Sequence, residues 1–267
     1  MNRIERKFKE LKRKRQKAFV VFLTCGYPDL RTTKILIKEL YRAGVDIIEL
    51  GIPFSDPLAD GKLIQESSAY ALKKGIDIFK VFKLASETRR ITSIPLCLLT
   101  YYNPIICFGL ERFMRMSRDS GVDGLIIPDL PPEESKDILK IAKSYGISVI
   151  FFISPTTSGE RLKLICNLSR GFIYYVSLTG VTGPREKLPV DLIDNLKKIK
   201  KITSKPVCVG FGISRPDQIK RLYKIVDGVI VGSAIIKKIK DNLGKPDLIK
   251  KVVDFVLWLR GNKISYV

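Results

Sequence analysis

Short runs of apolar, β-branched residues alternate along the chain with longer segments in which apolar positions recur three and four residues apart. The first pattern predicts buried strands and the second predicts amphipathic helices. We expect eight strands, at residues 19–24, 46–50, 96–101, 124–127, 148–153, 172–177, 206–210 and 228–231. Helices are expected between them, for example over residues 29–43, 135–145 and 189–200.

The strands are apolar almost throughout, as in residues 149–153, which is typical of a parallel sheet covered on both faces. Eight successive β–α units favour a closed (β/α)₈ TIM barrel over an open doubly wound sheet. The 267 residues suit a single barrel domain spanning 1–267. Before the first strand, Ile4, Phe8 and Leu11 stand at helical spacing, so we expect an additional N-terminal helix at the barrel's N-terminal end.

The chain contains no histidine. This absence excludes Ser/His/Asp triads, histidine-ligated zinc and imidazole acid/base catalysis, so any chemistry has to use carboxylates, Tyr, Lys, Cys or Ser. Five cysteines stand singly in apolar stretches without the spacing of metal ligands, and we expect reduced thiols and no metal site.

The chain carries 48 basic and 27 acidic residues, a formal net charge of +21. Because the lysines are scattered along the predicted helices, a lysine-rich solvated exterior is favoured over a polyanion-binding patch at residues 13–15. The apolar run 18–25 that follows the basic N-terminus is too short to cross a membrane. We therefore expect a cytoplasmic protein with neither a nucleic-acid nor a membrane partner.

Two carboxylates are candidates for catalysis. Glu49 stands late in the second predicted strand between apolar neighbours, where burial would raise its pKa and suit it to general acid/base chemistry. A structural carboxylate bonded to nearby loops is the alternative. The following loop, residues 52–61, holds two prolines and ends in Asp60, which either serves the chemistry or caps the next helix, while Asp56 suits a turn.

Glycines follow the last three predicted strands, in the segments 180–183, 210–214 and 232–233. Glycines let backbone N–H groups approach an anion, and the last two segments precede predicted helices whose N-termini carry partial positive charge. Barrel enzymes often bind phosphate on the loops after strands seven and eight. The three segments together predict a phosphate site, although each glycine alone is compatible with an ordinary turn.

The segment 49–61, ELGIPFSDPLADG, together with Gln65 resembles the signature of the tryptophan synthase α subunit family. The resemblance continues through Phe22 and Gly26, then through 99–101, 128–135, 180–183, 210–214 and 232–234, and so covers nearly the whole chain. It implies a retro-aldol cleavage of indole-3-glycerol phosphate to indole and glyceraldehyde 3-phosphate, in tryptophan biosynthesis. It also implies that no cofactor is needed, and that a β subunit binds at the barrel's C-terminal face in an α₂β₂ complex.

By position, the resemblance implies that Glu49 is the catalytic acid/base and that Asp60 assists at the indole nitrogen. It also implies that Tyr174 lies near the indole, with the adjacent Tyr175 as the alternative. The implied substrate-binding residues are Phe22, Leu99, Tyr101, Asp129 and Thr182, and the implied phosphate-binding residues are Gly183, Gly212, Gly232 and Ser233.

Other functions remain open from the sequence. A stand-alone lyase that releases free indole would share the same residues, and a catalytically silent activator of the β subunit would not require Glu49 and Asp60. A nucleic-acid-binding protein is suggested only by the net charge of +21. A different phosphate-binding barrel enzyme would require the segment 49–61 to be disregarded.

Overall fold

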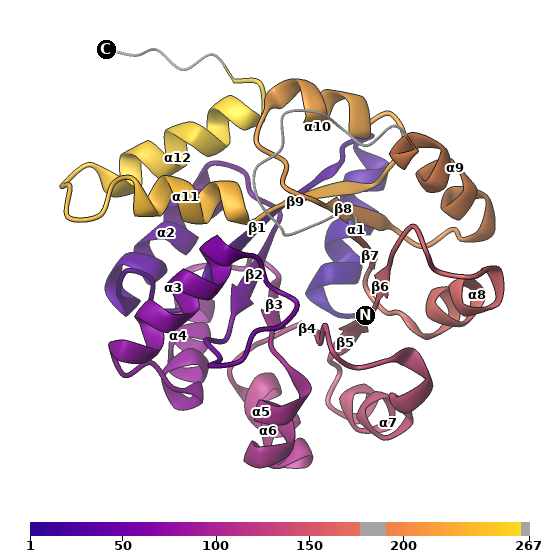
Figure 1. Ribbon diagram of the computed structural model, residues 1–267, viewed down its shortest axis with the longest axis horizontal. Helices are drawn as coiled ribbons and strands as arrows, with labels where there is room; N and C mark the ends of the chain where they lie inside the picture. The colour runs from indigo at the N-terminus through magenta and orange to yellow at the C-terminus, as the bar shows by residue number, and fades with distance from the viewer. Residues whose placement is uncertain (177–190, 263–267) are drawn as a thin grey trace.

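The computed structural model describes residues 1–176 and 191–262, and this part of the chain forms one sheet of nine parallel strands surrounded by helices (Figure 1). The strands are β1 (Ala18–Thr24), β2 (Ile47–Gly51), β3 (Leu96–Leu99), β4 (Gly124–Ile126), β5 (Ser148–Ile150), β6 (Phe152–Ile153), β7 (Ile173–Val176), β8 (Val207–Gly210) and β9 (Gly228–Val231). Their order in the sheet is β5-β4-β3-β2-β1-β9-β8-β7-β6.

The barrel closes through β5 and β6, which together occupy the single strand expected at 148–153. They are separated only by Phe151: β5 pairs with β4 and β6 pairs with β7. The two ends of the sheet are therefore two halves of one strand, which accounts for nine segments where eight were expected. The predicted (β/α)₈ barrel is confirmed.

The helices form the outer ring, as Figure 1 shows. They are α2 (Leu30–Arg42), α3 (Lys62–Lys73), α4 (Ile78–Ile91), α5 (Tyr102–Phe108), α6 (Leu110–Asp119), α7 (Lys136–Ser144), α8 (Gly159–Leu168), α9 (Leu192–Ile202), α10 (Pro216–Leu222), α11 (Ser233–Lys240), α12 (Leu248–Leu259) and the 3₁₀ turn η1 (Pro132–Glu134). Side-chain caps define some of their starts: Asp29 accepts a hydrogen bond from the Thr32 N–H at the start of α2, at 2.7 Å.

Residues on each strand alternate between two apolar cores. On β1, Phe19, Val21 and Leu23 belong to the core between sheet and helices, whereas Ala18 and Val20 belong to the core inside the barrel. The N-terminal helix α1 (Arg3–Arg13) contributes its predicted apolar residues, including Ile4 and Phe8, to this inner core. The expected helix therefore exists and packs at the N-terminal end of the barrel, where β1 begins.

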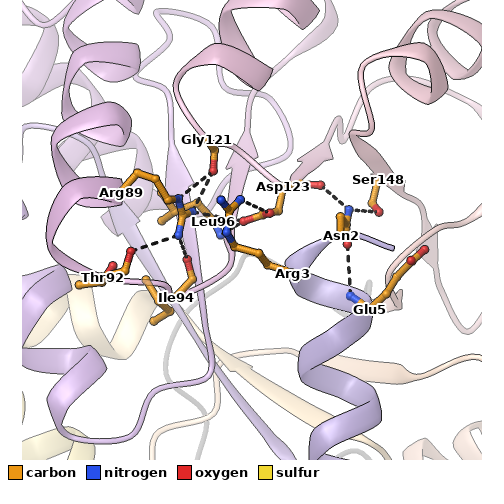
Figure 2. Close-up of polar contacts among 10 residues, drawn as sticks. All are labelled: Asn2, Arg3, Glu5, Arg89, Thr92, Ile94, Leu96, Gly121, Asp123 and Ser148. Atoms are coloured by element: carbon orange, nitrogen blue, oxygen red, sulfur yellow. Dashed lines mark hydrogen bonds and ion pairs between the residues drawn. The ribbon is translucent and has the colours of Figure 1, made fainter.

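Polar contacts hold α1 in place beneath the barrel (Figure 2). Asp123, only 2% exposed, accepts hydrogen bonds from the guanidinium groups of Arg3 at 2.9 Å and Arg89 at 3.2 Å. The Asn2 amide donates to the Asp123 carbonyl at 2.9 Å and to the Ser148 hydroxyl at 2.6 Å. The N-terminal end of the barrel is thus closed and stabilised, which leaves the opposite end for a site.

Candidate active site

A cavity of about 1250 Å³ opens at the C-terminal ends of the strands. Nine of the residues predicted for the site border it: Phe22, Glu49, Asp60, Leu99, Asp129, Tyr174, Gly212, Gly232 and Ser233. The predicted Thr182 and Gly183 lie outside the described residues. Tertiary folding thus gathers at one end of the barrel side chains that are widely separated in the sequence.

Glu49 lies on β2, directly across from Phe22 on β1 and Cys97 on β3. Its side chain is 0% exposed, and neither carboxyl oxygen has a hydrogen-bond partner among the described residues. Burial without compensating bonds raises the pKa of Glu49 to about 8, so the carboxyl group is largely protonated at neutral pH. The alternative, a structural carboxylate bonded to nearby loops, requires hydrogen bonds that Glu49 does not have with any described residue.

Asp60 ends the loop between β2 and α3 and is half-buried. Helix α3 has Gly61 as its N-cap, with no side-chain cap bond, so the alternative in which Asp60 caps this helix is wrong. Burial raises the pKa of Asp60 to about 6, while the neighbouring Tyr101 hydroxyl acts to lower it. Between about pH 6 and 8 the deeper Glu49 is protonated and Asp60 is ionised, so the two carboxyl groups carry different charges.

Tyr101 is placed differently from the other predicted pocket residues. It is buried behind the loop that carries Asp60, in a small side pocket that Phe22, Leu99 and Asp60 also line. Its hydroxyl accepts a hydrogen bond from the Ala59 N–H at 3.0 Å. Tyr101 therefore supports the loop, and it does not border the main cavity.

The alternation of side chains along β7 separates Tyr174 from Tyr175. Tyr174 borders the cavity, with its ring centroid 4.7 Å from that of Phe152, whereas Tyr175 is buried in the core between sheet and helices. Burial, together with the nearby carboxyl groups of Glu49 and Asp60, raises the pKa of Tyr174 well above its usual value. Of the two tyrosines, only Tyr174 lies where it can contact a molecule in the cavity.

Asp129 is exposed at the cavity rim after β4. Both of its carboxylate oxygens accept from the Tyr102 N–H, at 2.9 and 3.1 Å, at the start of α5. The carboxylate therefore joins the loops that follow β3 and β4 at the edge of the cavity.

The candidate phosphate site lies on the loops after β8 and β9, which are paired strands. Gly212 has a positive φ of 76°, a backbone conformation that favours glycine. Helix α11 begins at Ser233 with Gly232 as its N-cap, so its free N–H groups lie at the cavity. Helix α10 begins later, at Pro216, so the loop at Gly212 offers mainly loop N–H groups and not a helix N-terminus.

Several residues on the cavity wall were not predicted. Phe152, Phe211 and Arg161 all border the cavity. Phe152 faces the inside of the barrel together with Ile150, whereas Val149, Phe151 and Ile153 belong to the core between sheet and helices, so the alternation of the strand continues through Phe151. Arg161, which forms an ion pair with Glu133 at 3.2 Å, comes from α8 and is brought to the cavity only by the tertiary fold.

Two further observations concern other kinds of function. Within residues 1–176 and 191–262, no three His, Cys, Asp or Glu side chains are grouped so that they could hold a metal ion. In the same residues, no helix combines the length and apolar character needed to span a membrane.

The fold and the cavity define a TIM-barrel protein in which two carboxyl groups, one neutral and one ionised near neutral pH, border a cavity at its C-terminal face. The sequence model described as "Tryptophan synthase alpha chain" matches residues 8–257. The chain therefore belongs to the tryptophan synthase alpha chain family.

Known relatives agree with this assignment. The tryptophan synthase alpha chain of Thermoanaerobacter sp. (strain X514) is 48% identical over 260 residues, covering 97% of this chain and 99% of the relative. The crystal structure of tryptophan synthase subunit alpha from Legionella pneumophila str. Paris is similar with a TM-score of 0.91, at 35% identity and 98% coverage of both chains. A chain from the Pyrococcus furiosus tryptophan synthase α₂β₂ complex is similar with a TM-score of 0.86, at 41% identity, covering 91% of this chain and 98% of that one.

Proposed function

We propose that this chain is a carbon–carbon lyase that cleaves indole-3-glycerol phosphate to indole and glyceraldehyde 3-phosphate. The proposal rests on the pair Glu49 and Asp60, which border the same cavity and differ in protonation near neutral pH. Loops suited to binding a phosphate border the same cavity. The whole chain acts as one cytoplasmic barrel domain, and the reaction requires no metal or organic cofactor.

The reaction begins with a proton at indole C3. Protonated Glu49 delivers it, which converts the indole into an indolenine with positive charge developing on the ring nitrogen. Ionised Asp60 stabilises that charge. The bond between C3 and the side chain then breaks, its electron pair restores the aromatic indole, and the side-chain hydroxyl gives its proton to Glu49 as the aldehyde forms.

The remaining residues bind and orient the substrate. Phe22, Leu99 and Tyr174 offer apolar and aromatic surface to the indole, while Asp129, and Thr182 in the undescribed segment, contact its polar groups. The phosphate binds at Gly212, Gly232 and Ser233, with Gly183 from the undescribed segment. Anchoring the phosphate at one rim holds the reacting bond between the two carboxyl groups.

We further propose that a tryptophan synthase β subunit takes up the indole, in an α₂β₂ complex. The contact surface would be the barrel's C-terminal face, at the loops around Asp56, residues 103–104 and Thr182. Leu58 is 83% exposed and Ile106 is 49% exposed on this side, so apolar surface is available for a partner. The α₂β₂ complex of Pyrococcus furiosus, which contains a similar chain, supports this proposal.

The test is an assay of indole and glyceraldehyde 3-phosphate formation, with and without the β subunit from the same source. We expect Glu49→Gln to lower turnover by about 10³-fold or more and Asp60→Asn to lower it by at least about 10²-fold, with circular dichroism unchanged. Normal turnover by Glu49→Gln would refute the proposed acid/base role. Fast turnover without a β subunit, together with no complex in gel filtration, would instead support a stand-alone lyase.

A further inference from the structure

Asp60 has to be held accurately, although it stands at the end of a loop with little packing of its own. Residues 55, 56, 58 and 59 of this loop are exposed. The side chain of Asp60 is not fixed by a cap bond to α3. Its carboxyl group has a hydrogen bond with the Tyr101 hydroxyl, so its position depends on where Tyr101 and the rest of the loop are held.

The start of the loop is held by one hydroxyl group. Ser68, a buried residue on α3, donates a hydrogen bond to the Phe54 carbonyl at 3.0 Å and accepts one from the Phe54 N–H at 2.8 Å. One side chain thus satisfies both backbone polar groups of a residue 14 positions earlier in the chain. Buried backbone groups without a partner are costly, so this double contact favours a single position for Phe54.

A chain of contacts connects Phe54 with Asp60. The Phe54 ring packs against the ring of Tyr101, with centroids 5.3 Å apart, and the Tyr101 hydroxyl accepts from the N–H of Ala59, the residue before Asp60. The Gln65 side chain donates to the Asp60 carbonyl at 2.9 Å. Helix α3 therefore holds the loop at both ends, through Ser68 and Gln65.

We infer that Ser68 is a positioning residue for Asp60, acting through Phe54 and Tyr101 without touching the substrate. The inference rests on the proposed role of Asp60. Without the Ser68 hydroxyl, water has to satisfy the Phe54 backbone groups, and the Phe54 ring loses its fixed place against Tyr101. The loop then shifts, and Asp60 becomes more hydrated and less well aligned with the indole nitrogen.

The neighbouring Ser67 is a matched control. Ser67 is also buried on α3, and its hydroxyl bonds to the Thr24 hydroxyl at 2.6 Å and to the Ile64 carbonyl at 2.8 Å. Neither bond reaches the loop that carries Asp60. Ser67→Ala and Ser68→Ala therefore remove the same chemical group from the same helix, and only the second affects the loop.

The experiment compares Ser68→Ala, Ser67→Ala and Ser68→Thr in the coupled assay for glyceraldehyde 3-phosphate. We expect Ser68→Ala to lower kcat by about 10- to 100-fold while KM changes less than about threefold, because misalignment by about 1 Å is enough for such a loss. Ser67→Ala should stay within about threefold of wild-type kcat, and Ser68→Thr, which retains the hydroxyl, should recover most of the kcat lost.

A pH profile separates positioning from a general loss of stability. Burial holds the pKa of Asp60 at about 6, so a more hydrated Asp60 should move the acidic limb of the kcat profile to lower pH in Ser68→Ala. Wild-type kcat in Ser68→Ala, an unmoved limb, or an equal loss in Ser67→Ala would each overturn the inference. If Ser68→Ala does not fold, Ser68→Cys, a weaker hydrogen-bonding variant, takes its place under the same criteria.

Asp60→Asn, measured in parallel, separates this inference from the proposed function. Loss of activity in Asp60→Asn together with normal activity in Ser68→Ala would refute only the positioning role. Normal activity in Asp60→Asn would refute the proposed role of Asp60 itself.

Discussion

Gly210 at the end of β8 lies directly against Tyr174 on β7. A Cβ atom at Gly210 would stand 2.7 Å from the Tyr174 hydroxyl oxygen and 2.9 Å from its Cε1 atom, closer than real Cβ contacts allow. Both residues border the cavity, so the absence of a side chain at Gly210 leaves space for the tyrosine ring beside the carboxyl groups.

Gly210→Ala should therefore displace the Tyr174 ring toward the cavity. We expect kcat/KM for indole-3-glycerol phosphate to fall at least about tenfold and the free energy of unfolding to fall by about 1–3 kcal/mol, as in other overpacked sites. Gly159→Ala on α8 is the control, since a Cβ atom there has no neighbour within 4 Å. Steady-state kinetics and urea unfolding measure both effects, and unchanged kinetics in Gly210→Ala would show that the ring position is unimportant.

The two carboxyl groups predict a bell-shaped pH profile of kcat/KM. The rate should rise as Asp60 ionises near pH 6 and fall as Glu49 loses its proton near pH 8, although the apparent pKa values belong to the coupled pair. The substrate phosphate also titrates near pH 6. The pH profile of the residual activity of Asp60→Asn separates the two titrations. If the acidic limb persists in this variant, it belongs to the substrate phosphate, and the assignment to Asp60 is wrong.

The proposed phosphate site predicts an effect on binding rather than on chemistry. Ser233→Asp places a negative charge at the N-terminus of α11, where it should repel the substrate phosphate. We expect KM to rise at least about tenfold, a much smaller change in kcat, and loss of competitive inhibition by inorganic phosphate. Ser233→Ala, which adds no charge, should have a milder effect; equal phosphate inhibition in wild type and Ser233→Asp would place the anion elsewhere.

Replacing Asp123, which lies at the end of the barrel opposite the cavity, should lower the free energy of unfolding. Asp123→Ala would leave the partly buried guanidinium of Arg89 without its carboxylate and would remove the acceptor of the Leu96 N–H, at 3.0 Å. Removing one partner of a buried ion pair costs about 3–5 kcal/mol. Urea unfolding measures this loss. Asp241→Ala, which breaks an exposed pair with Lys237, should cost less than about 1 kcal/mol; similar losses in the two variants would contradict the structural role of Asp123.

The sequence by itself determined the architecture. Strands covered on both faces require nearly continuous apolar runs, and helices on a barrel require one apolar stripe, so both patterns are visible in the residues. The N-terminal helix with buried Ile4 and Phe8 is confirmed, and a strand overlaps each expected range, although β3 ends at Leu99 and the range 148–153 is divided at Phe151. Because parallel strands present their C-terminal ends on one side, strand order alone also brought Glu49, Tyr174 and Gly232 to one cavity.

Only the tertiary structure decided which side chains contact one another. These include the interruption at Phe151, the choice of Tyr174 over Tyr175, the place of Tyr101 behind the loop, and the bonds from Ser68 to Phe54. A hydroxyl or carboxyl group can bond with many partners, and its spacing in the chain does not say which partner the fold brings near. Burial patterns are local and repeat along a chain, whereas hydrogen-bond partners and pKa values depend on groups that only folding brings together.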